Sequence, residues 1–222
     1  MDRRQMLAAG LAAAVGAPAV AASPLPARKL IFVAFMLGDN ANVIDTAGPW
    51  ETFQDAMPMV DGKMAHPFRL FTVAPTLEPV QMTGGLVVKP HYSIDTAPQP
   101  HVIVVPAQRS TEASRAWLKA ASAKADMTMS VCTGAFQLGR VGLLDGLKAT
   151  THHDFYDDFA REFPKVQLER TPRFVDTGRI ATSGGLTSGI DLALHVVGRY
   201  FGPETAEATA RYMEHRQTDR PT

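Results

Sequence analysis

The chain has 222 residues, with 22 basic and 22 acidic side chains and a single cysteine. A formal net charge of zero gives no electrostatic reason to expect binding to nucleic acid or to an anionic membrane surface. One cysteine excludes an internal disulfide and a zinc site made of four cysteines. The length suits one domain with a full hydrophobic core.

The first 22 residues predict an export signal. Arg3 and Arg4 precede an Ala/Gly-rich stretch of weak hydrophobicity, and residues 19–21 (Ala-Val-Ala) have the small side chains of a cleavage site. These features favour the twin-arginine route, with a retained N-terminal anchor as the alternative. We therefore expect a signal peptide at 1–22, one domain at 23–222, and a periplasmic or otherwise exported protein. No later apolar run reaches membrane length, so we expect no membrane partner after signal removal.

The next part of the chain alternates strand-like and helix-like segments. Residues 29–37 are almost continuously apolar, as is typical of a strand buried on both faces of a parallel sheet. After a loop predicted at 38–45, residues 48–57 have a helical pattern with Pro49 in the first turn. The same patterns predict strands at 68–74, 101–106 and 127–131, a β excursion at 85–94, and an amphipathic helix at 110–125 with Ser/Thr capping candidates.

The second half continues the alternation. Residues 136–144 and 153–163 have helical patterns, and residues 173–183 contain two short strand-like runs around a turn. An apolar stripe spaced four, three and four predicts a long helix that ends at Gly202-Pro203, before a last helix at 204–215. Strands separated by helices of this length imply βαβ units. The sequence therefore predicts an α/β fold with a doubly wound, mostly parallel sheet.

Cys132 lies where a predicted strand ends and a helical pattern begins. Ligand sites in open parallel sheets lie beyond the carboxyl ends of the strands. A strand, nucleophile, turn and helix in this order form a nucleophile elbow, in which Gly134 and Ala135 would let the helix approach closely. We expect an exposed thiol whose pKa is lowered by the helix N-terminus. The alternative is a small buried hydrophobic side chain, the commonest role of a free cysteine.

Three motifs carry a family resemblance: "VIDTAGPWE" at 43–51, "VCTGAF...GLLDGLKATTH" at 131–152, and "TSGGLTSGID" at 182–191. Together they resemble the ThiJ/PfpI superfamily, which is class I glutamine amidotransferase-like, over about residues 29–205. The resemblance implies a flavodoxin-like three-layer sandwich. Within the superfamily the motifs are most similar to those of isonitrile hydratases, although amidotransferase-like sensor domains of transcription regulators share much of the same pattern.

The resemblance implies roles for three residues. Cys132 corresponds to the elbow nucleophile, Thr133 to the threonine that hydratases need next to it, and Asp45 to an acidic residue that faces the thiol. A carboxyl group near sulfur can transfer a proton to and from a substrate if a partly apolar pocket raises its pKa. From the local sequence alone, the better interpretation of Asp45 is a helix N-cap ahead of Thr46.

Other positions are expected to line the pocket. His152 matches a histidine near the thiol in many relatives, and we assign it a supporting role, as we do Gly134. Ala107 and Gln108 stand where relatives usually have Gly-Gly next to an oxyanion-type site. Alanine would adopt a positive φ only at a cost, so we expect a reshaped pocket in which the Gln108 amide is a donor.

The remaining histidines and glycines have simpler interpretations. The two glycines of the 182–191 motif could cradle an anion, but no phosphate-binding lysine accompanies them, so we favour a close turn that packs a helix on the sheet. Five histidines show no metal spacing, and among them His195 fits a hydrogen-bonded core position. They are His66, His91, His101, His195 and His215.

The resemblance implies a lyase that adds water to an isonitrile through a Cys132 thioimidate. The expected partner is a small-molecule substrate, with no nucleic acid, metal or organic cofactor, and the protein is expected to be a homodimer. Two alternatives stay open. One is a non-catalytic domain that senses a ligand or the redox state, and the other is a hydrolase, amidase or glyoxalase-like activity on the same elbow.

Overall fold

Seven strands form the central sheet of the computed structural model, which describes residues 23–216. In spatial order they are β12 (Phe174–Asp176), β13 (Ile180–Ser183), β9 (Met127–Ser130), β8 (Val102–Val105), β1 (Ile31–Met36), β4 (Phe68–Ala74) and β7 (Tyr92–Ser93). Every neighbouring pair is parallel except β12 and β13, which are antiparallel at one edge. The predicted α/β fold with a mostly parallel sheet is confirmed.

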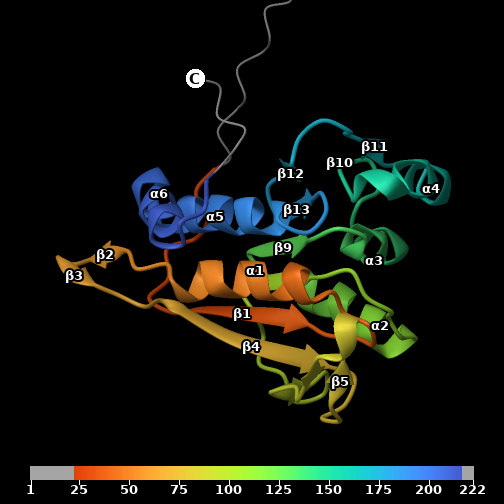
Figure 1. Cartoon of the computed structure of the whole chain (residues 1–222), viewed down its shortest axis with the longest axis horizontal. Helices are drawn as coiled ribbons and strands as arrows, with labels where there is room; N and C mark the ends of the chain where they lie inside the picture. Colours follow the sequence, from red (N-terminus) through yellow and green to blue (C-terminus); the bar gives the residue numbers. More distant parts are fainter. Residues whose placement is uncertain (1–22, 217–222) are drawn as a thin grey trace, which may run out of the picture.

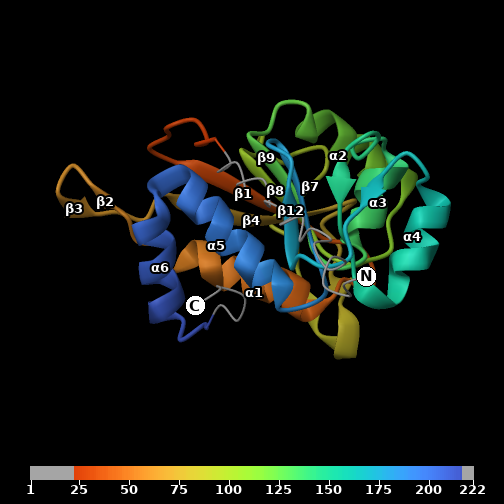
Figure 2. The same cartoon turned by 90° about the horizontal axis from the view of Figure 1, so that it is seen from above.

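Helices cover both faces of this sheet and make three layers (Figures 1 and 2). Side chains alternate across a strand, so Val102 and Val104 of β8 join one apolar cluster, while Ile103 and Val105 join the other. The first cluster includes residues of α1 (Val43–Gln54) and α5 (Ser188–Phe201), and α6 (Pro203–Tyr212) packs against α5. The second includes residues of α2 (Glu112–Ser122), α3 (Gly134–Arg140) and α4 (Tyr156–Glu162).

Short elements decorate the sheet. A hairpin of β2 (Met59–Val60) and β3 (Lys63–Met64) extends away from the layers, as Figures 1 and 2 show. The others are β5 (Val80–Gln81), η1 (Thr83–Gly85), β6 (Val87–Val88), β10 (Lys148–Ala149), η2 (His153–Phe155) and β11 (Gln167–Leu168). The hairpin was not expected from the sequence, because two-residue strands leave almost no periodic signal.

Helix α1 begins earlier than predicted. Residues 38–45 were expected to be a loop, but the Asn42 side chain accepts hydrogen bonds from the backbone N–H groups of Ile44 and Asp45 and caps a helix that starts at Val43. Pro49 therefore lies inside the helix rather than in its first turn. Asp45 is a helical residue on the buried side of α1, so its interpretation as the N-cap is wrong.

None of the helices within residues 23–216 is long and apolar enough to cross a membrane. The predicted twin-arginine signal at 1–22 lies outside the described residues, and export stays a prediction. The homodimer also stays a prediction.

Candidate active site

The cysteine follows strand β9 and has an unusual backbone conformation. Cys132 has φ of 57°, in the left-handed region that side chains other than glycine rarely adopt. Two contacts hold it there: its N–H donates to the Gly184 carbonyl at 2.9 Å, and its carbonyl accepts from the Thr151 hydroxyl at 2.9 Å. A strand that ends in a positive-φ residue before a helix is the geometry of a nucleophile elbow.

Gly134 allows α3 to begin directly after this turn. A Cβ atom at position 134 would lie 2.0 Å from the Val105 carbonyl oxygen, which is backbone and cannot move aside. Ala135, the next residue, is fully buried. The expected close approach of small residues to the sheet is present, and it places the start of α3 against the end of β8.

Thr151 and its neighbour offer a matched test of the contact that holds the elbow. Thr151→Val should lower the free energy of unfolding by about 0.5–1.5 kcal/mol, because it removes the shorter of the two hydrogen bonds to the Cys132 carbonyl and leaves only the Ala135 N–H at 3.4 Å. Thr150 is equally buried, but its hydroxyl has no hydrogen-bond partner among the described residues. Thr150→Val should therefore be neutral or stabilising in urea denaturation. Equal losses in the two variants would show that the Thr151 contact does not stabilise the fold.

Helix α1 carries an acidic group into the same site. The Asp45 side chain has no exposed surface, and its Oδ2 accepts a hydrogen bond from the Ala107 backbone N–H at 3.1 Å. Its Oδ1 is buried with no close hydrogen-bond partner among the described residues. Burial disfavours the charged form and raises the pKa of Asp45 to about 6, against the opposing effect of the Ala107 and Leu186 N–H groups.

The thiol is neither as exposed nor as acidic as the sequence suggested. Only 6% of Cys132 is exposed, and burial together with the negative charge of Asp45 raises the pKa of the thiol to about 11. The expected lowering by the helix N-terminus is wrong for this site. Loss of hydration and a neighbouring carboxylate outweigh the local donors, so the resting cysteine is a neutral thiol.

Donors nevertheless surround the sulfur. The backbone N–H and the hydroxyl of Thr133 both act as hydrogen-bond donors that lower the pKa of the Cys132 thiol, and the Leu186 N–H does the same. Leu186 has φ of 54°, so a second strained residue points a backbone group at the site. These groups would stabilise negative charge that develops on or near sulfur during a reaction.

The loop after β8 differs from its expected role. Neither Ala107 nor Gln108 has a positive φ, so the predicted conformational cost of alanine is absent. The backbone N–H of Ala107 binds Asp45, while the Gln108 Oε1 accepts from the Gly38 N–H. The Gln108 side chain therefore stabilises its own loop, and its Nε2 is left buried without a partner among the described residues.

His152 lies behind the glycine loop. A Cβ atom on Gly185 would lie 2.2 Å from the His152 ring, and the His152 Nδ1 accepts from the Asp154 backbone N–H. No hydrogen bond within residues 23–216 joins His152 to Cys132. Because of its contact with Gly185, His152 supports the 184–186 turn rather than the thiol directly.

His152 also lies in a small group of potential metal ligands. One side-chain N or O atom each of His152, His153 and Asp154 lies within 4.8 Å of the others, so these three side chains could hold a metal ion.

The 182–191 motif contributes more than a turn. Gly189 packs the start of α5 closely against Val131, as the preferred interpretation requires. The Gly184 carbonyl and the Leu186 N–H, however, contact the cysteine, a role that the sequence analysis missed along with that of Thr151. All three residues lie within the motifs at 131–152 and 182–191, and that position was the available signal. A contact made by a backbone group, however, does not depend on residue type and leaves no pattern in the sequence. The His195 Nε2 donates to the Asp176 carboxylate at 2.7 Å, so His195 is hydrogen-bonded as expected, although its side chain is only partly buried.

The mostly parallel sheet and the positive φ of Cys132 place this protein among α/β proteins with a cysteine at the elbow position. The sequence agrees with a narrower assignment, because the model of the DJ-1/PfpI family matches residues 32–199. The chain belongs to the DJ-1/PfpI family.

Individual relatives differ in what they do. Isonitrile hydratase of Pseudomonas putida is 30% identical over 189 residues, covering 82% of this chain and 78% of that protein. HTH-type transcriptional regulator GbdR of Pseudomonas aeruginosa is 29% identical over 181 residues, covering 79% of this chain but 48% of the regulator, so the chain spans about half of it. A ThiJ/PfpI family protein from Pseudomonas syringae superposes with a TM-score of 0.75 at 26% identity, covering 89% of this chain and 80% of that one.

Proposed function

We propose that this protein is a cysteine-dependent lyase that adds water to an isonitrile and releases an N-substituted formamide. The observation that carries the proposal is the pair formed by the Cys132 thiol and the buried Asp45 carboxyl group, whose raised pKa suits proton transfer. The relative named isonitrile hydratase, with which the chain shares 30% identity, supports the choice of reaction.

The pair holds one proton over a wide pH range. Below a pH of about 6 both groups are protonated, and between about 6 and 11 the pair holds a single proton, which resides on sulfur. In that state the Asp45 carboxylate can take the proton from the thiol as sulfur attacks. The site therefore makes its nucleophile at the moment of reaction and needs no resting thiolate.

The chemistry follows from this proton. Sulfur forms a bond to the terminal carbon of the isonitrile, and Asp45 passes the proton to the same carbon, which gives a thioimidate. Water then adds to that carbon, with its proton taken up by Asp45 and transferred to nitrogen. Collapse breaks the carbon–sulfur bond and returns the proton to the sulfur and carboxylate pair, leaving the formamide. The N–H and hydroxyl of Thr133 and the N–H of Leu186 stabilise the charge that develops near sulfur.

The near-complete burial of Cys132 favours a substrate whose reactive group is slender. With 6% of Cys132 exposed, a broad electrophile such as a branched ester would need the covering residues to move apart. An isonitrile ends in a single linear carbon that carries no substituent. Such a group can reach a nearly buried sulfur end-on while its bulky substituent stays outside.

The test offers the purified protein cyclohexyl isocyanide and follows formamide formation from pH 4.5 to 9. The ratio kcat/KM should rise about tenfold for each pH unit below a pH of about 6 and then level off, because deprotonation of the pair creates the reactive state. Glutamine and methylglyoxal serve as control substrates for amidase and glyoxalase-like activities. Turnover of either control but not of the isocyanide would replace the proposal with that activity.

Redox sensing fits the site less well. Oxidation of cysteine proceeds through the thiolate, and a pKa of about 11 leaves little thiolate at neutral pH.

A further inference from the structure

An open depression of about 720 Å³ lies beside α3 and the loop after β8. Its lining consists of three arginines, two glutamines and a serine, with no carboxylate. They are Gln108, Arg109, Ser110, Arg115, Gln137 and Arg140. The walls belong to the segment that binds Asp45 through Ala107, to α2, which carries Arg115, and to the helix that follows Cys132.

The arginines of the depression differ in how far their charge is already compensated. Arg109 pairs with Asp39, and Arg140 pairs with Glu162, both at exposed positions where such pairs contribute little. Arg115 instead donates to the carbonyl and hydroxyl oxygens of Ser110, and no carboxylate in residues 23–216 pairs with it. The depression therefore keeps at least one positive charge uncompensated.

A hydrogen-bond network fixes the polar wall. The Ser110 hydroxyl donates to the Gln137 Oε1, and the Gln137 Nε2 donates to the Gln108 carbonyl at 3.2 Å. Because the Gln108 Oε1 accepts from Gly38, the orientation of the Gln108 amide is set, and its Nε2 is the group left without an acceptor. A buried donor without a partner is costly. Because the Nε2 has almost no exposed surface, a ligand oxygen that satisfies it must displace the atoms that cover it.

We propose that this depression binds the anionic group, a carboxylate or a phosphate, of a small molecule through the Arg115 guanidinium and the Gln108 side-chain amide. The guanidinium can donate two parallel hydrogen bonds to carboxylate or phosphate oxygens, and the neutral amide of Gln108 can donate a third. The binding does not depend on isonitrile hydration. A ligand held there contacts two segments of the candidate active site: the loop after β8, whose Ala107 N–H binds Asp45, and α3, which follows Cys132.

The experiment measures binding of inorganic phosphate and, separately, of acetate to the full protein by calorimetry and NMR, at constant ionic strength set with chloride. We expect saturable binding of at least one of them. Arg115→Gln and Gln108→Glu should each weaken it about tenfold or more. Gln108→Glu keeps an oxygen for the Gly38 N–H and replaces only the donor, and far-UV circular dichroism checks that this variant folds as the original protein does.

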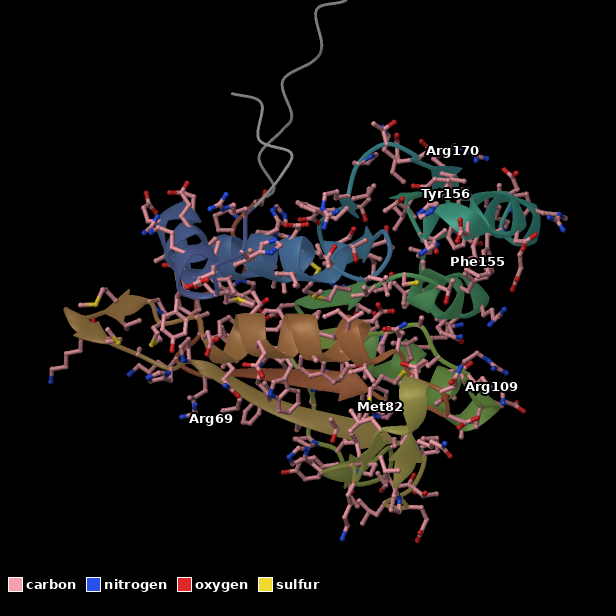
Figure 3. All side chains as sticks on the ribbon, viewed as in Figure 1. Arg69, Met82, Arg109, Phe155, Tyr156 and Arg170 are labelled. Carbon is pink, nitrogen blue, oxygen red and sulfur yellow. The ribbon has the colours of Figure 1, made fainter. Side chains whose placement is uncertain are left out.

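Arg69→Gln is the matched control. Like Arg115, Arg69 has no carboxylate partner within residues 23–216: it donates to the backbone carbonyls of His66 and Phe68, and Figure 3 shows it far from Arg109. This variant should bind the anion as the original protein does. Binding of phosphate alone would assign phosphorylated ligands, and binding of acetate alone would assign carboxylic acids. Failure of both anions to bind, or equal binding by all variants, would overturn the proposal whether or not the protein hydrates isonitriles.

Discussion

Cys132→Ala is expected to remove isonitrile hydration by at least about a thousandfold, since it deletes the atom that forms the thioimidate. The same variant should unfold with a free energy within about 1 kcal/mol of the original, because it removes one small atom from a nearly closed site. Mass spectrometry should detect a covalent adduct at Cys132 in the original protein when the isocyanide is in excess.

Cys132→Ser provides the control for this experiment. Serine keeps the shape of the elbow and a hydroxyl near Asp45, but its alkoxide is far harder to form than a thiolate, so we expect neither an adduct nor measurable turnover. A Cys132→Ala variant that kept most of its turnover would instead mean that water attacks the isonitrile directly. The covalent mechanism would then be wrong even if the reaction were right.

Asp45→Asn is expected to change activity and stability in opposite directions. The variant should lose a factor of about 10²–10⁴ in kcat/KM, because the amide cannot accept or deliver the proton that moves between sulfur and substrate carbon. It should also be more stable than the original protein at neutral pH. The reason is that burial opposes the charge of Asp45, raising its pKa from 3.8 to about 6 in the fold.

The sign of the effect follows from proton binding. The folded protein holds the Asp45 proton more tightly than the unfolded chain, so stability contributed by this group is complete below pH 4 and is lost as the pH rises through 6. The difference between the two pKa values corresponds to at most about 3 kcal/mol. Asparagine carries no charge at any pH and can still accept from the Ala107 N–H, so its advantage should be near zero at pH 4 and about 1–3 kcal/mol at pH 8.

Urea denaturation of both proteins at pH 4 and pH 8 measures this advantage. Asp95→Asn, a change at an exposed carboxylate, should alter stability by less than about 0.5 kcal/mol at both pH values. A stability difference for Asp45→Asn that does not depend on pH would show that the carboxyl group is ionised in the fold without cost. Its assignment as the proton carrier would then fail.

An Asp45→Asn variant that is more stable but inactive would be typical of a substitution in a functional site. Asp45 leaves a buried oxygen without a close partner, and Cys132 and Leu186 adopt strained backbone conformations at the same place. Each of these features costs free energy of folding, and none is needed to pack the sheet. Sites where local rules are broken are commonly those that carry function.

Much of the fold could be predicted because its signals are local. The strand at 68–74 was predicted with the bounds that β4 has, and the Thr111 side chain caps α2 as its sequence suggested. The start of α1 was missed, since Asn42 and Asp45 are equally good caps by residue type and only the Asn42 side chain turns out to accept the N–H groups. Pro49 misled the prediction because proline usually marks a first turn.

The amino-acid sequence by itself determined the order of strands and helices and the position of Cys132 between a strand and a glycine-led helix, because apolar periodicity and small residues act over a few neighbouring positions. Only the tertiary structure decided how the site is ionised. Burial of the thiol and carboxyl group, and the effect of the Asp45 charge on the thiol, arise when α1 packs against the sheet and places Asp45 at the segment after β8, near Cys132. The same packing brought Thr151 and the 184–186 loop onto the cysteine backbone, contacts that depend on distances between segments far apart in the chain.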